Sequence, residues 1–366
     1  MALPTVADVA TAAGVSRQTV SNVLNSPHIV RESTRERVEK AIEDLNYRPH
    51  ASARRLRTRK SGTIGVRMDR VLDGISGSLL DRFLHAVTEQ ADARGMRIML
   101  YTASSPEEEI ARIGKLRDGA DVDAFVLTST FYGDPRTAWL IEQGVPFVTF
   151  GRPWGVDDEN DPQHLWVDVD GAAGVAQAAT HLAESGSTRI AFFGWPEGSA
   201  TGDDRRSGWE RVMLERFPGE PKIVATAEDD VQRARSAAID LLRDRPEVDG
   251  LVCVSDSLAL GASLAAVAVG RPQLPIVGFD NTPVAAAVGL PSVEQDLSAV
   301  AAGALELLLG ERGDDVVHRE LAPGEAHRLI TPHLVLRTPT LHPEDRPGRR
   351  DDAATGGPTP TGKVRQ

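Results

Sequence analysis

The chain has 366 residues, with 41 Lys and Arg against 53 Asp and Glu, a formal net charge of −12 at pH 7 and one cysteine, Cys253. This length predicts about two or three domains. An internal disulfide is excluded, the nine histidines show no metal-ligand spacing, and no apolar run of about 18 residues predicts a helix across a membrane.

Residues 5–25 predict two short helices joined by a glycine turn. Thr5 is expected to cap the first helix, Gly14 to end it with a positive φ, and Ser16 to cap the second. One face of the second helix is apolar, and the other carries the polar side chains Arg17, Gln18, Ser21, Asn22 and Asn25. Such side chains suit base edges and phosphates, and the spacing is typical of a helix-turn-helix. An ordinary helical hairpin with a polar solvent face is the alternative.

A third helix is expected near residues 33–45, with a capping-box pattern that begins at Ser33. A linker follows, and its residues 48–60 hold Arg48, Arg54, Arg55, Arg57, Arg59 and Lys60 without an acid. Residues 1–61 have 11 basic and 6 acidic side chains, whereas the rest of the chain has 30 and 47. A basic head on an acidic body favours a nucleic-acid partner, although a solvated basic face or an Arg-rich codon bias would give a similar composition.

Several motifs of the head match a known family. They are Asp8-Val9-Ala10, Ala13-Gly14-Val15-Ser16, Thr19-Val20-Ser21, Val23-Leu24-Asn25, Thr34-Arg35, Val38, Ala41-Ile42, Leu45, Tyr47, Pro49, Ala53-Arg54 and Leu56. With them the head resembles the LacI/GalR repressors, in which the segment matching 50–58 is a hinge helix that folds on operator DNA. The resemblance implies further DNA contacts from Thr5, Ser16, Thr19, Tyr47, His50, Ala53, Arg54 and Leu56, the last as a minor-groove wedge. Asn22, Arg31 and His50 depart from the family pattern, where Arg, Ser and Asn are usual.

From residue 63 onward, short apolar strands alternate with helical segments. The expected strands are 63–68, 96–100, 124–128 and 146–150, then, after a Pro-, Gly- and Asp-rich break at 151–165, 166–169, 189–194, 222–226, 250–255 and 275–279. Such a pattern indicates parallel sheets covered on both faces. The expected fold is therefore multi-domain, with an all-α helix-turn-helix head and an α/β core of two doubly wound parallel-sheet lobes that resembles periplasmic binding proteins.

We expect four segments along the chain. They are a helix-turn-helix domain at 1–47, a hinge helix and linker at 48–61, an effector domain at 62–338 and a disordered tail at 339–366. Within the effector domain, lobe 1 is expected at about 62–151 and 292–326, and lobe 2 at about 152–291 and 327–338. The strand near 292–295 and an apolar helix at 299–309 would thus return to lobe 1, and 328–336 to lobe 2. The tail lacks leucine heptads for a tetramer, so a homodimer is expected.

Polar side chains follow several of these strands, where ligand sites of parallel sheets lie. The resemblance implies a ligand site of Arg152, Arg205, Ser255, Asp256, Asp280 and Gln295. Arg205 and Asp280 would bind effector hydroxyls, whereas Asp256 and Asp170 are also explained as helix N-caps. Aromatic residues that either stack on a sugar ring or belong to the core are Trp195, Trp166, Trp154 and Tyr132.

These features favour a sequence-specific DNA-binding regulator, a repressor released from a palindromic operator by a small carbohydrate. A ligand that acts as corepressor is one alternative, and a solute-binding protein without DNA function is another. The first residues lack the charged and apolar regions of a secretory signal, which opposes the latter and predicts a cytoplasmic protein. An enzyme is not expected, because no phosphate loop or nucleophile elbow follows a strand. No cofactor, metal or membrane partner is expected.

Overall fold

The computed structural model describes residues 4–47, 60–68, 77–155, 160–310, 316 and 324–337. Two compact units are present. The first contains Asp81–Val169 and Asp296–Ile330 together with the N-terminal helices, and the second contains Asp170–Gln295. No helix within the described ranges is long and apolar enough to cross a membrane.

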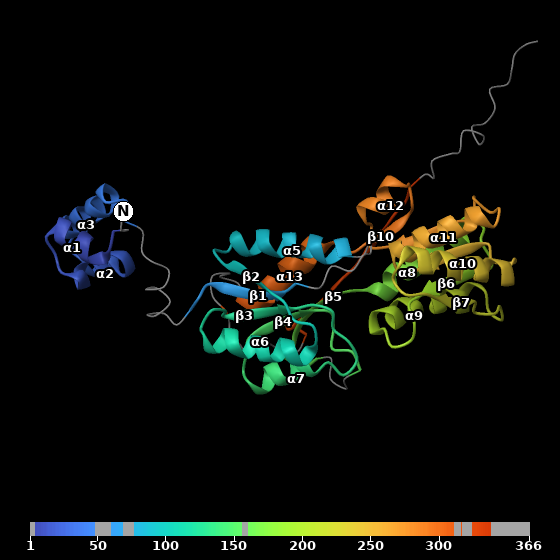
Figure 1. The fold of residues 1–366 in the computed structure, drawn as a ribbon, viewed down its shortest axis with the longest axis horizontal. Coiled ribbons are helices and arrows are strands. Elements are labelled where there is room, and N and C mark those ends of the chain that lie inside the picture. The colour runs from blue at the N-terminus through green and yellow to red at the C-terminus, as the bar shows by residue number, and fades with distance from the viewer. Residues whose placement is uncertain are drawn as a thin grey trace, which may run out of the picture. The chain divides into compact units, whose positions relative to one another are not determined.

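The head consists of short helices around a small apolar core (Figure 1). Its elements are α1 (Val6–Ala13), α2 (Arg17–Asn25), the 3-10 turn η1 (Pro27–Ile29) and α3 (Glu32–Asp44). The predicted caps are confirmed: the Thr5 hydroxyl accepts from the Asp8 N–H, and that of Ser16 accepts from the Thr19 N–H. Gly14 ends α1 with a φ of 66°, a left-handed conformation that glycine adopts without strain. The core is formed by Val9, Ala10, Ala13, Val20, Val23, Val38, Ala41 and Tyr47.

The predicted capping box at Ser33 is wrong. Helix α3 begins at Glu32, so Ser33 lies inside its first turn, and the N-cap is Arg31, which makes no capping hydrogen bond with its side chain. Val30, two residues before the helix, packs against the core of the head. Glu32 compensates for the missing cap, because an acid in the first turn interacts favourably with the helix dipole.

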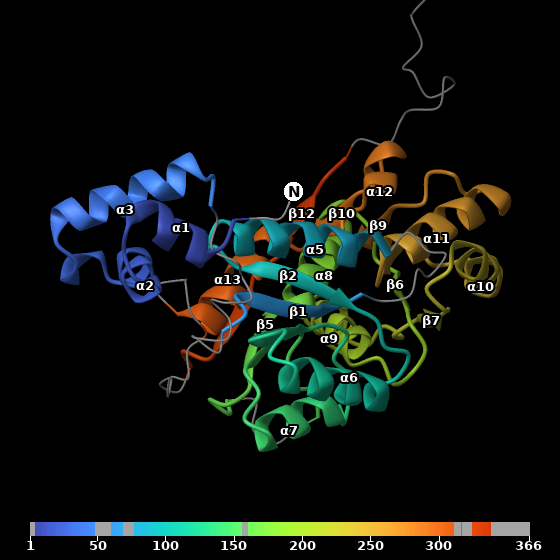
Figure 2. The same cartoon turned by 60° about the vertical axis from the view of Figure 1, so that its left-hand side comes forward.

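The first unit is built on a parallel sheet of six strands in the order β11-β5-β4-β3-β1-β2. The strands are β1 (Thr63–Arg67), β2 (Arg97–Tyr101), β3 (Ala124–Leu127), β4 (Phe147–Phe150), β5 (Leu165–Val169) and β11 (His327–Ile330). The helices are α5 (Gly77–Asp92), α6 (Pro106–Asp118), α7 (Pro135–Glu142) and α13 (Leu297–Leu309). Helices α5 and α13 cover one face of the sheet, and α6 and α7 cover the other (Figures 1 and 2).

The second unit repeats this plan with the strand order β12-β10-β9-β8-β6-β7. The strands are β6 (Ile190–Gly194), β7 (Val224–Thr226), β8 (Gly250–Cys253), β9 (Ile276–Phe279), β10 (Ser292–Glu294) and β12 (His333–Val335), of which β12 runs antiparallel to β10. The helices are α8 (Gly171–Glu184), α9 (Ala200–Arg216), α10 (Val231–Asp244), α11 (Asp256–Ala268) and α12 (Pro283–Ala287). The chain reverses direction across the sheet after β7, so right-handed crossovers place α9 on one face, packed with α8, and α10 with α11 on the other. The expected fold class is confirmed.

Three strands lie in a different sheet from the one predicted. The strand at 166–169 was assigned to lobe 2, but β5 pairs with β4 and β11 in the first sheet. The strand near 292–295 was assigned to lobe 1, but β10 pairs with β9 in the second sheet. The start of 328–336 was assigned to lobe 2, but β11 pairs with β5 in the first sheet. The chain therefore passes between the units at three points. They are Val169 at the end of β5, Gln295 directly after β10, and Ile330 at the end of β11.

Candidate functional site

Helix α2 presents the polar face that the sequence predicts for DNA contact. Arg17 and Gln18 are exposed at its first turn, and Asn22 lies one turn later. The Gln18 amide Nε2 donates to the Asn22 Oδ1 at 3.0 Å, which orients both amides along the helix surface. An oriented amide can make the paired hydrogen bonds that adenine offers in the major groove.

The other predicted DNA contacts fall into three groups. Thr5 and Ser16 are exposed N-caps, and Thr19 and Ser21 are half-buried on α2. Asn25 is the last residue of α2. Tyr47 lies in the core of the head, with only 5% of its surface exposed. The contacts expected from His50, Ala53, Arg54 and Leu56 lie outside the described residues and stay predictions.

Arg205 is the centre of a buried polar cluster in the second unit. Its Nη2 lies 3.7 Å from the Asp280 Oδ1, and its Nη1 donates to the Val254 carbonyl at 2.6 Å. The Gln295 amide donates to the same Asp280 oxygen at 2.6 Å. The guanidinium carbon lies 3.7 Å from the centre of the Phe279 ring. The structure thus brings together three of the predicted ligand residues. Asp280 and Gln295 directly follow β9 and β10, whereas Arg205 lies within α9 and not at a strand end, as the sequence analysis placed it.

A second acidic group, Asp229, adjoins this cluster and was missed in the sequence. Its Oδ1 accepts from the Ser255 hydroxyl at 2.6 Å and from the Trp195 indole N–H at 3.2 Å. Trp195 in turn lies against Arg205, with 5.4 Å between the guanidinium carbon and the ring centre. The available signal was the acidic pair after the strand at 222–226: Asp230 caps α10, which leaves Asp229 without a helical role.

Asp256 has a structural role. The N-cap of α11 is Ser255, so the N-cap interpretation of Asp256 is wrong, whereas Asp170 does cap α8. The Asp256 carboxylate accepts from the Ser292 hydroxyl at 2.6 Å and from the Thr282 N–H at 2.7 Å, which ties α11 to β10 and to the loop after β9. Burial raises its pKa.

The buried carboxyl of Asp280 has an unusual affinity for a proton. Burial raises its pKa to about 7, the attraction of Arg205 opposes this, and the nearby carboxylates of Asp256 and Asp229 add to it. Its backbone also has a φ of 103°, which is strained for a residue with a side chain. Strain and a perturbed pKa at the same residue are typical of a functional position.

This pKa predicts a pH dependence of stability. The pKa is higher in the folded protein than the ordinary 3.8, so the folded state holds the proton more tightly and stability falls as the pH rises from about 4 to 7. The loss is on the order of 3 kcal/mol. Urea unfolding of the wild type and Asp280→Asn between pH 5 and pH 8 measures it, since asparagine cannot titrate. We expect the advantage of the wild type over the variant to shrink with rising pH, and a constant difference would contradict the assignment.

Arg152 is the one predicted ligand residue that belongs to the first unit. Its Nε donates to the Asp168 Oδ2 at 2.8 Å, and its guanidinium carbon lies 4.8 Å from the centre of the Trp154 ring. Of the remaining aromatic candidates, Trp166 is buried and stacks on His327, as a core residue does, whereas Tyr132 is exposed.

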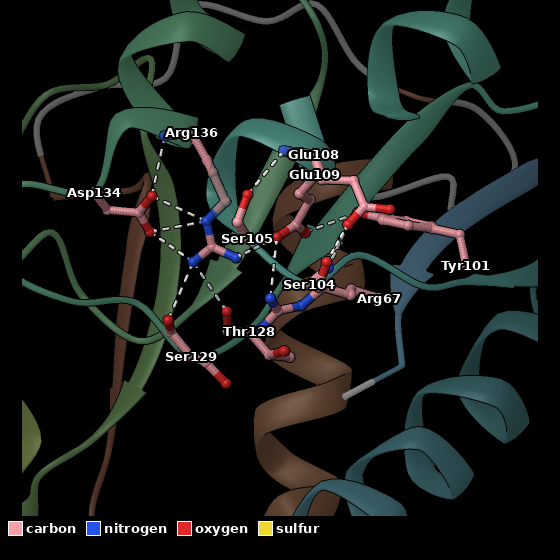
Figure 3. A network of polar contacts seen from close by, with 10 residues as sticks. All are labelled: Arg67, Tyr101, Ser104, Ser105, Glu108, Glu109, Thr128, Ser129, Asp134 and Arg136. Atoms are coloured by element: carbon pink, nitrogen blue, oxygen red, sulfur yellow. Dashed lines mark hydrogen bonds and ion pairs between the residues drawn. The ribbon is translucent and has the colours of Figure 1, made fainter. Parts of the chain in front are cut away.

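The first unit also contains a buried charged network that the sequence analysis missed (Figure 3). Arg136 is 1% exposed and donates to the Glu109 Oε2 at 2.8 Å and to the Asp134 Oδ2 at 2.6 Å. Glu109 is fully buried and also accepts from the Tyr101 hydroxyl at 3.0 Å, with the Arg67 Nη1 at 3.4 Å. The network joins the carboxyl ends of β1 and β2 to α6 and α7. In the described part of the chain, no group of three or more His, Cys, Asp or Glu could hold a metal ion.

Comparisons with known proteins match both parts of the chain. Residues 5–50 match the family model of bacterial regulatory proteins of the lacI family, and residues 76–306 match the model of periplasmic binding proteins and the sugar binding domain of the LacI family. The regulator CelR of Thermobifida fusca is 34% identical over 77% of this chain and 83% of its own length. The ribose operon repressor of Halalkalibacterium halodurans is 31% identical over 92% of this chain and 97% of its own.

Solved structures agree with these matches. A complex of the transcriptional regulator CelR with cellobiose has a TM-score of 0.65 and 29% identity, and the match covers 91% of this chain and 99% of that one. The lac repressor dimer bound to operator has a TM-score of 0.72 over 93% of this chain and 100% of that one, and at 23% identity it supports the fold alone.

Proposed function

Since the chain belongs to the LacI family of bacterial regulatory proteins, we propose that it is a repressor that a small neutral carbohydrate releases from operator DNA. It is a DNA-binding transcriptional regulator and not an enzyme. The proposal includes a cytoplasmic homodimer on a palindromic site, with a head at 1–47, a linker at 48–61 and an effector domain at 62–338.

The buried cluster of Arg205, Asp280 and Gln295 carries the carbohydrate part of the proposal. Guanidinium N–H groups donate and carboxylate oxygens accept, so together they satisfy the hydroxyls of a polyhydroxylated ligand. The complex of the relative CelR with cellobiose supports the same class of ligand. Ser255, Asp256 and Arg152 stay predicted ligand residues, although the hydrogen bonds of Asp256 to Ser292 and Thr282 already give it a structural role.

The charge around Arg205 favours a neutral ligand. The carboxylates of Asp229 and Asp256 act on Asp280, so three acidic groups share the neighbourhood of one guanidinium. A phosphorylated sugar would bring negative charge into a buried site with three acidic groups and one guanidinium, where even the Asp280 carboxyl has a raised pKa. We therefore expect uncharged sugars to bind and sugar phosphates to be rejected.

Operator release tests the proposal. The operator is first obtained by selection from random DNA, and its affinity for the full chain is then measured with cellobiose, maltose, ribose or glucose 6-phosphate. We expect at least one neutral sugar to weaken DNA binding and the phosphate to have no effect. Tighter DNA binding with a neutral sugar would establish a corepressor instead, and no effect of any neutral sugar would contradict a carbohydrate effector.

Base reading is expected to depend on the exposed face of α2. Arg17→Ala or Gln18→Ala should each cost about 1–3 kcal/mol at particular base pairs. Arg37→Ala is the control, because Arg37 is an exposed arginine on α3 and not on the predicted reading face. Selection from random DNA measures the preference of each variant. If both α2 variants select the wild-type sequence with wild-type stringency, α2 is not the reading helix.

A further inference from the structure

The chain enters the sheet of the first unit directly after the basic stretch of the linker, residues 48–60. Lys60 is exposed, whereas the next residue, Ser61, is only 4% exposed. We propose that Asp123 is a positioning residue for DNA binding, because its carboxylate fixes this point of entry and thereby holds the linker and the head for contact with operator. The inference concerns the DNA-binding step and does not depend on which effector the protein binds.

The Asp123 carboxylate accepts from two successive backbone N–H groups. Its Oδ1 accepts from the Ser61 N–H and its Oδ2 from the Gly62 N–H, each at 2.7 Å. Gly62 has a φ of 63°, a left-handed conformation of the kind that turns successive N–H groups toward one anion. Hydrogen bonds to a charged acceptor are stronger than those between neutral groups. We call this contact the linker anchor.

Arg97 holds the same two residues from the other side. Strand β1 lies between β2 and β3 (Figure 1), with Asp123 directly before β3 and Arg97 at the start of β2. The Arg97 guanidinium donates to the Ser61 carbonyl, and the Arg97 backbone N–H donates to the Gly62 carbonyl at 2.9 Å. Both backbone N–H groups and both carbonyls of Ser61 and Gly62 therefore have partners, so the backbone is fixed where the linker ends.

The second unit contains a similar contact, which shows what the aspartate does for the fold alone. Asp249 directly precedes β8, and its carboxylate accepts from the N–H groups of Thr188 and Arg189, each at 2.8 Å. This contact fixes the entry to β6, which has the same place in its sheet as β1 has in the first. No basic linker leads into β6, so the two contacts differ in what they hold.

The linker anchor also lies one residue further from its strand than the contact in the second unit. Ile64 of β1 pairs with Ala124, and Ile190 of β6 pairs with Gly250, so each aspartate directly precedes a paired residue. The aspartate of the first unit accepts from the N–H groups two and three positions before Ile64, whereas that of the second accepts from those one and two positions before Ile190. The shift toward the linker favours a role beyond strand entry.

A fixed end of the linker favours DNA binding for an entropic reason. Residues 48–60 contain six basic side chains and no acid, a composition that suits contact with DNA phosphates. A residue that is free in the unbound protein loses conformational entropy when DNA orders it, whereas a residue that is already fixed does not. If the linker anchor opens, Ser61 and Gly62 join the free part of the chain, and operator binding must order them as well.

Operator binding by full-length variants tests the linker anchor, with an operator selected from random DNA by the wild type. Asp123→Asn keeps the shape of the side chain but turns an amide NH₂ toward one of the two N–H donors. It should therefore weaken operator binding about tenfold. Asp249→Asn removes the matched contact in the second unit and should leave operator binding unchanged. Urea unfolding of both variants shows whether they lose similar stability.

Two glycines provide a second matched pair, which decides the matter if Asp123→Asn does not fold. Gly62 and Gly95 have φ values of 63° and 71°, and a Cβ at either would meet no described neighbour within 4 Å. Alanine is therefore strained to a similar degree at both positions, but only Gly62 belongs to the linker anchor. Gly62→Ala should weaken operator binding severalfold, and Gly95→Ala, in the turn before β2, should leave it unchanged.

Hydrogen–deuterium exchange of the peptide that contains Ser61 and Gly62 measures the linker anchor itself. Faster exchange of this peptide in Asp123→Asn, together with weaker operator binding than in Asp249→Asn, supports the proposal. If Asp123→Asn exchanges faster but binds operator as Asp249→Asn does, the contact serves the fold alone and the proposal is overturned. Wild-type exchange of this peptide in Asp123→Asn also overturns it, because the carboxylate then does not hold the end of the linker.

Discussion

Replacing Arg136 with methionine is expected to lower the free energy of unfolding by about 3–5 kcal/mol, the cost of removing one partner of a buried ion pair. Glu109 is fully buried, and its carboxylate would lose the bond from the Arg136 Nη1. The remaining Arg67 Nη1 is 3.4 Å away, too far to replace a bond of 2.8 Å in full. The carbonyls of Thr128 and Ser129 would lose a donor as well.

Two further variants separate the buried charge from a general effect of the substitution. Arg117→Met removes an arginine of the same unit whose partner, Asp118, is mostly exposed, and should change stability by less than about 1 kcal/mol. The double variant Glu109→Met with Arg136→Met should be more stable than Arg136→Met alone, because the uncompensated carboxylate is gone. Urea unfolding measures all three. A loss for Arg136→Met no greater than for Arg117→Met would show that the network contributes little.

The parts of the fold that local interactions determine could be predicted from the sequence. The caps at Thr5 and Ser16 join atoms three residues apart, so a short stretch of sequence contains the whole interaction. Two caps were predicted wrongly: the N-cap of α3 is Arg31 and not Ser33, and that of α11 is Ser255 and not Asp256. In each case the helix begins one or two residues from the expected position, a difference that the capping preferences of neighbouring side chains do not resolve in the sequence.

The placement of strands in sheets could not be predicted in the same way. An apolar strand such as 166–169 fits a buried position in either sheet, and only its pairing with β4 and β11 decides between them. The same limit applies to the charged groups: Arg136 and Glu109 are 27 residues apart, and Asp229 meets Ser255 across 26 residues. Asp280 was found because it directly follows a strand at the carboxyl edge of the sheet. Arg205 was assigned to a strand end as well, but it lies within α9 and reaches Asp280 from there.

Replacing Asp280 with alanine is expected to abolish the response to the effector. The carboxylate is the acceptor that faces Arg205 and Gln295, so the variant loses the group expected to accept from sugar hydroxyls. A charged hydrogen bond to a buried partner is worth about 2–5 kcal/mol, which corresponds to a loss of sugar affinity of about 30-fold to several thousandfold. DNA affinity without sugar should stay close to that of the wild type, because the predicted DNA-reading face lies on α2, in the head.

The sugar can shift the protein between its DNA-bound and released states only by its difference in affinity for the two. If Asp280 supplies most of that difference, Asp280→Ala should still bind operator but stay bound at sugar concentrations that release the wild type. Asp240→Ala, which removes an exposed acid on α10, serves as the control and should release normally. Asp280→Asn keeps the shape of the side chain, so it is the second variant to measure if Asp280→Ala does not fold. The measurement is operator occupancy as a function of the concentration of the sugar that releases the wild type. If Asp280→Ala leaves the operator at the same sugar concentration as the wild type, the effector contact lies elsewhere.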